Sequence, residues 1–278
     1  MNQETPNKLG LIAGRGVYPR LLAESAREQG VEYVFAVAFK KETNPIIERV
    51  ADKVIWLNFG QLNAMLNALK QSGVKQAVMA GQITPTHLFQ LKPDRRALDL
   101  LMQLRVRNAE TIFSAVGDEL KSIGVELMPA HLFMESAMPT AGQLSLREPT
   151  VQEQQDMDMG FNVAKVTSGL AIGQTVVIKE GTILAVEAFE GTDETLIRAG
   201  RMGGPGAVVV KAAKKGHDMR FDIPVIGMHT MKVLKKIKAS VLAVEASRTI
   251  LLDRGKIIEK ADSIGLCFCA SEVHDHDR

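Results

Sequence analysis

Short apolar runs alternate with amphipathic stretches through the first half of the chain. The runs of strand length are rich in apolar and β-branched residues and span 9–13, 31–39, 53–57, 74–80 and 125–128. Most of the intervening stretches repeat apolar residues every three or four positions, as a helix with one buried face does. These predicted helices span 19–30, 61–72, 97–107 and 110–123. This alternation predicts an N-terminal, Rossmann-like, doubly wound parallel sheet.

The second half follows a polar segment that contains proline and glycine. Because one hydrophobic core rarely serves 278 residues, we predict a domain at 1–138, a linker at 139–150 and a C-terminal domain at 151–278. The C-terminal pattern predicts a helix, a hairpin and then mixed helices and strands at 152–170, 175–188, 192–201, 207–212, 230–239, 241–244 and 249–269. A hairpin beside crossover units indicates an α/β domain with a mixed sheet.

Composition narrows the function classes. The net charge is only +2 and aromatic residues make up 5%, which argues against a nucleic-acid binder. No apolar run approaches the roughly 20 residues that span a bilayer, and the polar N-terminus lacks the order of a signal peptide. We therefore expect a cytoplasmic protein. Cys267 and Cys269 are expected to be buried thiols on one face of a strand, because a metal site needs more ligands.

A glycine turn lies between the first predicted strand and helix. Gly14, Arg15 and Gly16 would let the backbone approach phosphate oxygens beside a helix N-terminus. The third glycine of a dinucleotide fingerprint is missing, and Lys40 and Lys41 stand where an NAD site would place an acid. The alternatives are nucleotide or phosphate contact, a tight turn without a ligand, and a nicotinamide site.

A second candidate group is Glu190, Gly191, Thr192 and Asp193, where a strand runs into a helix. Thr192 is a suitable N-cap, and the acids after it suit the positive end of the helix. Capping leaves Glu190 unexplained. An acid at a strand end beside a helix N-terminus is a usual place for a catalytic site, so both interpretations stay open.

The most informative stretch contains Asp218, Arg220 and Asp222. Pro224 disfavours helix before it, so we predict an extended chain that places these three side chains on one face. The carboxylates could hold Mg²⁺, and the guanidinium could hold a phosphate oxygen. The alternative is a surface ion-pair ladder on an edge strand.

Basic residues surround this stretch. Lys211 and Lys214 add positive charge, and His217 precedes the acidic motif as a ligand or a bystander. The helix expected at 230–239 carries four lysines. These lysines are either a solvated helix face or a group that is weakly attracted to an anionic membrane surface.

Five motifs, in order across residues 9–270, resemble one family: GLIAGRGVYPRLLA, AGQITP, EGTDETLIRAG, GGPGAVVVKAAKKGHDMRFDIPVIG and VLAVEASRTILLDR. The sequence is similar to the UDP-2,3-diacylglucosamine hydrolases of lipid A synthesis, in the class unrelated to metallophosphoesterases. The most specific of these motifs are EGTD at Glu190–Asp193 and DMRFDIP at Asp218–Pro224.

The resemblance implies Mg²⁺-dependent hydrolysis of an acylated nucleotide sugar that lies between two domains. It places the essential aspartate at Asp222, or failing that at Asp218, with both as metal ligands and Arg220 at the phosphoryl group. The residues then expected to bind substrate are Gly14, Arg15, Gly16, Gly81, Glu190, Gly191, Thr192, Asp193, Lys211, Lys214 and His217. Contact with the cytoplasmic face of the inner membrane and a homodimer are further expectations.

Two other functions remain in play at this level. One is a nucleotide-dependent oxidoreductase built on the first domain. The other is a non-catalytic module that binds nucleotide sugars or lipid.

Overall fold

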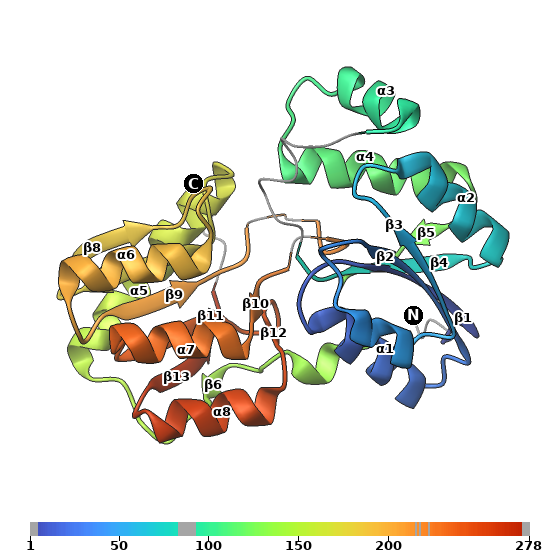
Figure 1. The fold of residues 1–278 in the computed structure, drawn as a ribbon. Coiled ribbons are helices and arrows are strands. Elements are labelled where there is room, and N and C mark those ends of the chain that lie inside the picture. The colour runs from blue at the N-terminus through green and yellow to red at the C-terminus, as the bar shows by residue number, and fades with distance from the viewer. Residues whose placement is uncertain (1–4, 83–92, 215, 217, 222, 274–278) are drawn as a thin grey trace. The chain divides into compact units, whose positions relative to one another are not determined.

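The computed structural model describes residues 5–82, 93–214, 216, 218–221 and 223–273. The chain divides into two compact units (Figure 1). Unit 1 comprises Met1–Met134 and Asp218–Asp222, and unit 2 comprises Glu135–His217 and Ile223–Arg278. The chain therefore passes between the units three times, and the short run Asp218–Asp222 is grouped with unit 1 although its flanks belong to unit 2.

Unit 1 is built on a five-stranded sheet in the order β3-β2-β1-β4-β5. All of its neighbouring strands are parallel. The strands are β1 (Lys8–Ala13), β2 (Tyr33–Phe39), β3 (Lys53–Leu57), β4 (Gln76–Ala80) and β5 (Glu126–Leu127). The strand order reverses between β1 and β4, and such a switch point is where open α/β sheets usually bind ligands.

Helices cover both faces of this sheet. They are α1 (Tyr18–Glu28), α2 (Leu62–Ser72), α3 (Arg95–Gln103) and α4 (Ala109–Ser122), with a 3₁₀ helix, η1 (Pro45–Arg49). The buried residues of α2, α3 and α4 share one cluster with side chains of β1, β2 and β4, whereas α1 packs separately on β1 and β4 (Figure 1). The predicted doubly wound parallel sheet is confirmed.

Unit 2 contains a six-stranded mixed sheet in the order β6-β13-β11-β9-β7-β8. Strands β9, β11 and β13 are parallel, whereas β6, β7 and β8 pair antiparallel to their neighbours. The strands are β6 (Gly142–Gln143), β7 (Thr175–Lys179), β8 (Thr182–Val186), β9 (Val208–Lys211), β11 (Val241–Glu245) and β13 (Cys267–Ser271). The predicted mixed sheet is confirmed.

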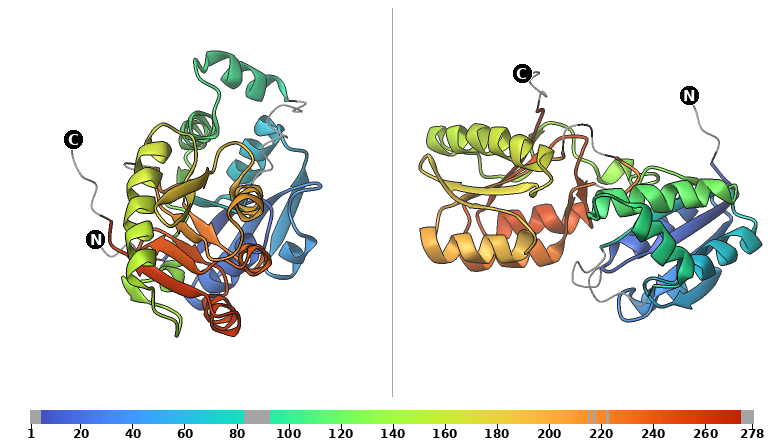
Figure 2. Two further views of the ribbon diagram at one scale, coloured as in Figure 1. Left: turned by 90° about the vertical axis from the view of Figure 1, so that its left-hand side faces the viewer. Right: turned by 90° about the horizontal axis from the view of Figure 1, so that it is seen from above.

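Two cores lie on opposite faces of the unit 2 sheet. Helix α5 (Val151–Gly169) covers one face through Met157, Phe161 and Ala164. The other face is covered by α6 (Thr192–Gly203), α7 (Met228–Ile237) and α8 (Arg254–Ser263), and Figure 2 shows the same arrangement from two further directions. A small parallel pair, β10 (Val225–Ile226) and β12 (Ile250–Leu251), and a 3₁₀ helix, η3 (Glu135–Ala137), complete the unit.

The division into units differs from the predicted domains in two respects. Residues 139–150, predicted as a linker, belong to unit 2. Strand β6 pairs with β13, and the buried Ser145 is hydrogen-bonded to the backbone at the start of β13. The Ser145 hydroxyl donates to Leu266 O at 2.9 Å and accepts from Phe268 N at 2.7 Å. The second difference is the grouping of Asp218–Asp222 with unit 1.

Cys267 and Cys269 are free, buried thiols in the core under α5. They lie two apart on β13 and face the same side of the sheet, as expected from the sequence.

Candidate active site

The residues Asp218–Phe221 form a tight turn. Hydrogen bonds to the Asp218 side chain from within the turn stabilise it. The Asp218 carboxylate accepts hydrogen bonds from Arg220 N at 3.0 Å, from Nε at 2.9 Å and from Nη2 at 2.5 Å. The Phe221 N–H donates to Asp218 O at 3.2 Å. An aspartate that bonds to the backbone two residues on is a common way to fix a turn.

The extended conformation predicted for this segment is therefore wrong over Met219–Phe221. Pro224 restricts only the residue before it, and local bonds from Asp218 decide the conformation further upstream. Asp222 and His217 were also predicted as site residues, and both lie outside the described residues.

The Arg220 guanidinium packs on helix α4. A Cβ built on Gly117 would lie only 3.1 Å from Arg220 Nη1, so glycine leaves the space that the guanidinium occupies. The pKa of Arg220 is raised above its ordinary value by the hydrogen bond to Asp218, and the charge of Asp118 contributes to the shift. The hydrogen bonds to Asp218 thus hold this guanidinium in place beside Gly117.

Apolar and backbone contacts hold the turn on unit 1. The Phe221 ring packs on Phe113 of α4, with 5.9 Å between ring centroids. The Ala130 N–H donates to Met219 O at 2.7 Å, and the buried Tyr18 hydroxyl of α1 donates to Ala130 O. The turn is therefore tied to both α1 and α4.

Two glycine loops meet at the switch point of the unit 1 sheet. A Cβ on Gly14 would lie 2.6 Å from Gln82 O, and a Cβ on Gly81 would lie 2.6 Å from Arg15 O. The backbones of Arg15 and Gln82 pair in both directions, at 2.7 and 3.1 Å. Close backbone approach therefore explains Gly14 and Gly81. Gly16 instead has a φ of 97°, a conformation that favours glycine.

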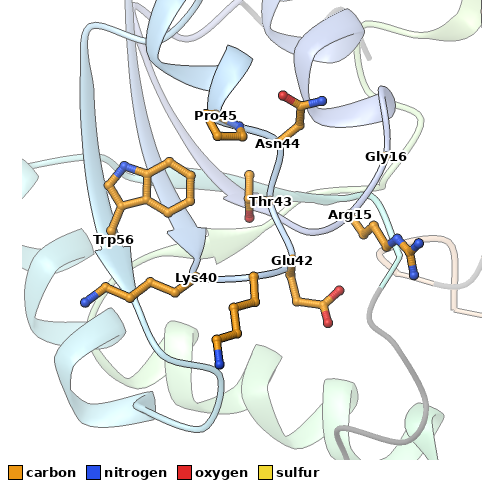
Figure 3. Close-up of a pocket in the computed structure, with 9 residues that line it drawn as sticks. Arg15, Gly16, Lys40, Glu42, Thr43, Asn44, Pro45 and Trp56 are labelled. Atoms are coloured by element: carbon orange, nitrogen blue, oxygen red, sulfur yellow. The ribbon is translucent and has the colours of Figure 1, made fainter.

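A pocket of about 670 Å³ opens beside these loops, at the carboxyl ends of β1 and β2 (Figure 3). Figure 3 shows Arg15 and Trp56 on opposite sides of the segment that carries Thr43 and Asn44. The Thr43 hydroxyl accepts from Phe39 N at 2.8 Å and donates to Ala13 O, which fixes this loop on two strands. The lining residues are Arg15, Gly16, Lys40, Lys41, Glu42, Thr43, Asn44, Pro45 and Trp56.

The pocket combines three basic side chains with one indole ring. Arginine and lysine side chains suit a phosphate group, and an aromatic ring suits a nucleotide base. Lys40 and Lys41 are followed in the lining by the carboxylate of Glu42, near the position where a dinucleotide site would hold the ribose with an acid. The basic side chains of the pocket suit a nucleotide phosphate.

A polar cluster lies in unit 2, at the start of α6. The Lys211 side chain, only 8% exposed, donates from Nζ to Thr192 Oγ1 at 2.7 Å. Thr192 Oγ1 donates in turn to Glu187 Oε1 at 3.0 Å. Glu187 Oε2 is buried and has no hydrogen-bond partner among the described residues. A buried ammonium with three donors and a carboxylate oxygen with a spare lone pair are both able to bind a further polar group.

The prediction that Thr192 caps α6 is wrong by one position. The N-cap is Gly191, whose φ is 84°, and it makes no side-chain cap. The Thr192 hydroxyl is engaged by Lys211 and Glu187 instead of by the helix backbone.

The two acids of the same motif have separate partners. Glu190 accepts from Arg198 Nη2 at 2.5 Å, and this hydrogen bond lowers the pKa of the Glu190 carboxyl. Asp193 accepts from the Thr230 hydroxyl at 3.2 Å. The motif is therefore an ordered set of polar groups within unit 2.

A buried ion pair fixes the point where the chain leaves β9. Glu245, 2% exposed, accepts from Lys165 Nζ at 2.8 Å and from Ala213 N at 2.8 Å. Lys214 follows directly and is partly exposed. Glu245 thereby holds the backbone at Ala213, five residues before the turn at Asp218.

The donor set can be compared with what magnesium needs. Among the described residues, no group of three His, Cys, Asp or Glu side chains is arranged to hold a metal. Mg²⁺ is commonly bound through only one or two carboxylates plus substrate phosphates. The Asp218 carboxylate is an oxygen donor of that kind, and both of its oxygens also accept hydrogen bonds from Arg220.

The predicted site residues fall into two groups. Unit 1 holds Gly14, Arg15, Gly16, Gly81, Asp218 and Arg220, and unit 2 holds Glu190, Gly191, Thr192, Asp193, Lys211 and Lys214.

Sequence reasoning missed the neighbours of these residues. It did not identify Gly117 and Asp118, which border Arg220, or the pocket residue Trp56. A glycine inside a helical pattern was the one available signal for Gly117. Nothing in the local sequence indicated that Trp56 would line the same pocket as Arg15.

Comparison with known proteins gives two family matches that together cover most of the chain. The model described as the LpxI N-terminal domain matches residues 8–137, and that of the LpxI C-terminal domain matches residues 140–269. A protein of Caulobacter vibrioides named UDP-2,3-diacylglucosamine pyrophosphatase LpxI is 31% identical over 270 residues. That alignment covers 93% of this chain and 95% of the relative.

Solved structures give only weak matches. An ADP complex of N5-carboxyaminoimidazole ribonucleotide synthetase has a TM-score of 0.28 at 15% identity, over 69% of this chain and 44% of that chain. A glycinamide-RNase-transformylase T from Mycobacterium tuberculosis has a TM-score of 0.26 at 17% identity, over 65% and 44%. The chain spans less than half the length of these two proteins, and scores this low establish no shared fold.

Proposed function

The chain belongs to the LpxI family, and from that premise we propose that it hydrolyses the pyrophosphate bond of UDP-2,3-diacylglucosamine. The products would be UMP and 2,3-diacylglucosamine 1-phosphate, an intermediate of lipid A biosynthesis. The enzyme is accordingly a hydrolase of a phosphorus-containing anhydride. We place it in the cytoplasm and in the class unrelated to metallophosphoesterases.

The observation that best supports this proposal is the fixed Arg220 guanidinium. Hydrolysis of a pyrophosphate develops negative charge on the phosphoryl oxygens, and catalysis rests mainly on positioned charge. The Arg220 guanidinium is hydrogen-bonded to Asp218 on one side and packs against Gly117 of α4 on the other. A guanidinium fixed in this way needs little reorganisation when it meets a phosphate.

The acids of the same motif take the remaining roles. Asp222 would orient the attacking water and accept its proton, and Asp218 would hold Arg220. Magnesium, held by Asp222 and Asp218, would neutralise charge on the pyrophosphate oxygens.

The pocket of unit 1 would take the nucleotide part of the substrate. Trp56 offers a face for the uracil ring, and Lys40 and Arg15 offer charge to the phosphates. Unit 2 carries a polar group of its own, in which Glu187 Oε2 can accept from a substrate hydroxyl and the Lys211 ammonium retains donors.

The direct experiment incubates the purified protein with UDP-2,3-diacylglucosamine and magnesium and measures UMP by chromatography. Hydrolysis in ¹⁸O-labelled water then identifies the phosphorus that is attacked, because the label enters only that product. UDP-glucose serves as a control for the acyl requirement. The proposal fails if the acylated substrate binds but no UMP appears, which would point to a non-catalytic binding module.

A further inference from the structure

Helix α3 carries apolar side chains on its outer face as well as on its inner one. Ala97 and Leu100 are buried in the core of unit 1, at 8% and 7% exposed. Leu98 and Met102, four residues apart, are 47% and 67% exposed, and Val106 beyond the helix end is 58% exposed. Within α3, Leu98 and Met102 lie on one face because they are four residues apart. In Figure 1 and in the left view of Figure 2, α3 stands at the periphery of unit 1, away from the sheet.

Positively charged side chains border the apolar strip formed by Leu98, Met102 and Val106. Arg95, Arg105 and Arg107 are all exposed, and Arg95 lies on the strip's own face, three residues before Leu98. The only acid in residues 95–107 is Asp99. Arg96 does not add to the free charge, because it pairs with Glu119 at 2.5 Å. Apolar side chains flanked by cations are the composition of a helix that lies at a lipid interface.

The lysine-rich helix α7, considered from the sequence as a membrane contact, lacks this combination. Its apolar residues Met231, Leu234 and Ile237 are buried in the core of unit 2. Its outer face therefore offers charge without an apolar anchor, and charge alone gives weak, salt-sensitive binding.

Helix α5 has exposed apolar residues without the accompanying positive charge, and it therefore supplies a matched control. Val166 and Leu170 are 65% and 68% exposed at the same four-residue spacing. The nearest lysine, Lys165, is committed to the buried Glu245. Residues 151–178 contain no other lysine or arginine, so these two residues give an exposed apolar pair of similar size without cations close in sequence.

We propose that the outer face of α3 docks on an anionic lipid bilayer. Charge complementarity between the arginines and anionic headgroups favours a membrane. The choice of a membrane over a protein partner also rests on the proposed function, since a substrate with two acyl chains is presented by a bilayer. No helix within the described residues is long and apolar enough to cross a bilayer, and α3 would instead lie in its surface.

The test measures co-flotation of the full-length protein with vesicles of phosphatidylethanolamine containing a quarter phosphatidylglycerol. The wild type should float with these vesicles and not with phosphatidylcholine vesicles. Leu98→Ser/Met102→Ser should reduce the bound fraction at least about fivefold, because it removes the apolar anchor. Val166→Ser/Leu170→Ser should bind like the wild type. Arg95→Glu/Arg105→Glu, two exposed changes that spare the core, should also lose binding.

Each contrary outcome removes the proposal. It fails if the wild type does not float, or if the α3 variants float as well as the wild type. It also fails if the Leu98→Ser/Met102→Ser variant changes only the oligomeric state in light scattering, which would assign the face to a second copy of the chain. Hydrolysis of detergent-dispersed substrate by that variant should stay at the wild-type rate. Loss of flotation with intact hydrolysis separates this proposal from the proposed function.

Discussion

Arg220 and Gly117 are in close contact, because a Cβ at position 117 would lie 3.1 Å from Arg220 Nη1 and the guanidinium would have to shift by a few tenths of an ångström. Gly117 lies inside α4 and has no positive φ, so its backbone accepts alanine without strain. The absence of a side chain at this position therefore serves the guanidinium rather than the helix.

Gly117→Ala should separate stability from activity. Alanine improves helix propensity by about 1 kcal/mol, so the free energy of unfolding should stay equal or rise. A guanidinium displaced by a few tenths of an ångström should lower kcat about tenfold. Urea unfolding and steady-state kinetics measure the two effects. Gly255→Ala in α8, where a Cβ meets nothing within 4 Å, is the matched control and should leave kcat unchanged.

Arg220→Lys should lower kcat/KM about 100-fold, because an ammonium cannot reproduce the fixed fork of donors. The free energy of unfolding should change by less than about 1 kcal/mol, since the Asp218–Arg220 pair is partly exposed. Arg20→Lys, in the Arg20–Glu24 pair of α1, is the control. Activity of Arg220→Lys within twofold of the wild type would exclude a role for the guanidinium.

Much of the fold followed from local pattern. The strand Lys53–Leu57 was predicted with its observed bounds, and α2 begins one residue after its predicted start. These segments carry their own signals, namely a β-branched run in one and a helical repeat closed by Gly73 in the other. Local signals of this kind do not depend on what the segment packs against.

The site was harder to predict because its contacts are distant in sequence. Arg220 and Gly117 are 103 residues apart by number, and no local pattern links them. The turn at Asp218 was mistaken for an extended segment because Pro224 was given too much weight over the aspartate's own hydrogen bonds. The sequence left both a cap and a functional role open for Thr192, because its partner Lys211 lies on β9, 19 residues further along the chain.

Trp56 gives a direct probe of the proposed nucleotide pocket, since it is the single tryptophan of the chain. UMP should change its emission in a saturable way. Lys40→Ala should raise the Kd for UMP about fivefold, the effect of losing roughly 1 kcal/mol of charge interaction. Uridine, which lacks the phosphate, should bind both proteins equally. Constant emission up to saturating product concentrations would mean that the nucleotide lies elsewhere.

Glu245→Gln should destabilise unit 2 strongly. Glutamine can keep the bond from Ala213 N but leaves Lys165 without its buried counter-charge, and breaking such a pair costs about 3 kcal/mol. Urea denaturation should therefore show a lower free energy of unfolding. Lys256→Ala breaks the exposed pair with Asp253 and should change that free energy by less than about 0.5 kcal/mol. Equal effects of the two variants on the free energy of unfolding would show that the buried Glu245–Lys165 pair stabilises the protein no more than the exposed pair does.

The most direct test of the account is the rate of UMP release by Asp222→Ala, measured with UDP-2,3-diacylglucosamine and magnesium beside the wild type. Wild-type turnover should disappear on chelation and return with added Mg²⁺. The variant should unfold at the wild-type temperature and turn over at least about 1,000-fold more slowly, because it lacks the group that positions the attacking water. A folded variant with near-normal UMP release would contradict the assignment of hydrolysis to the Asp218–Asp222 motif.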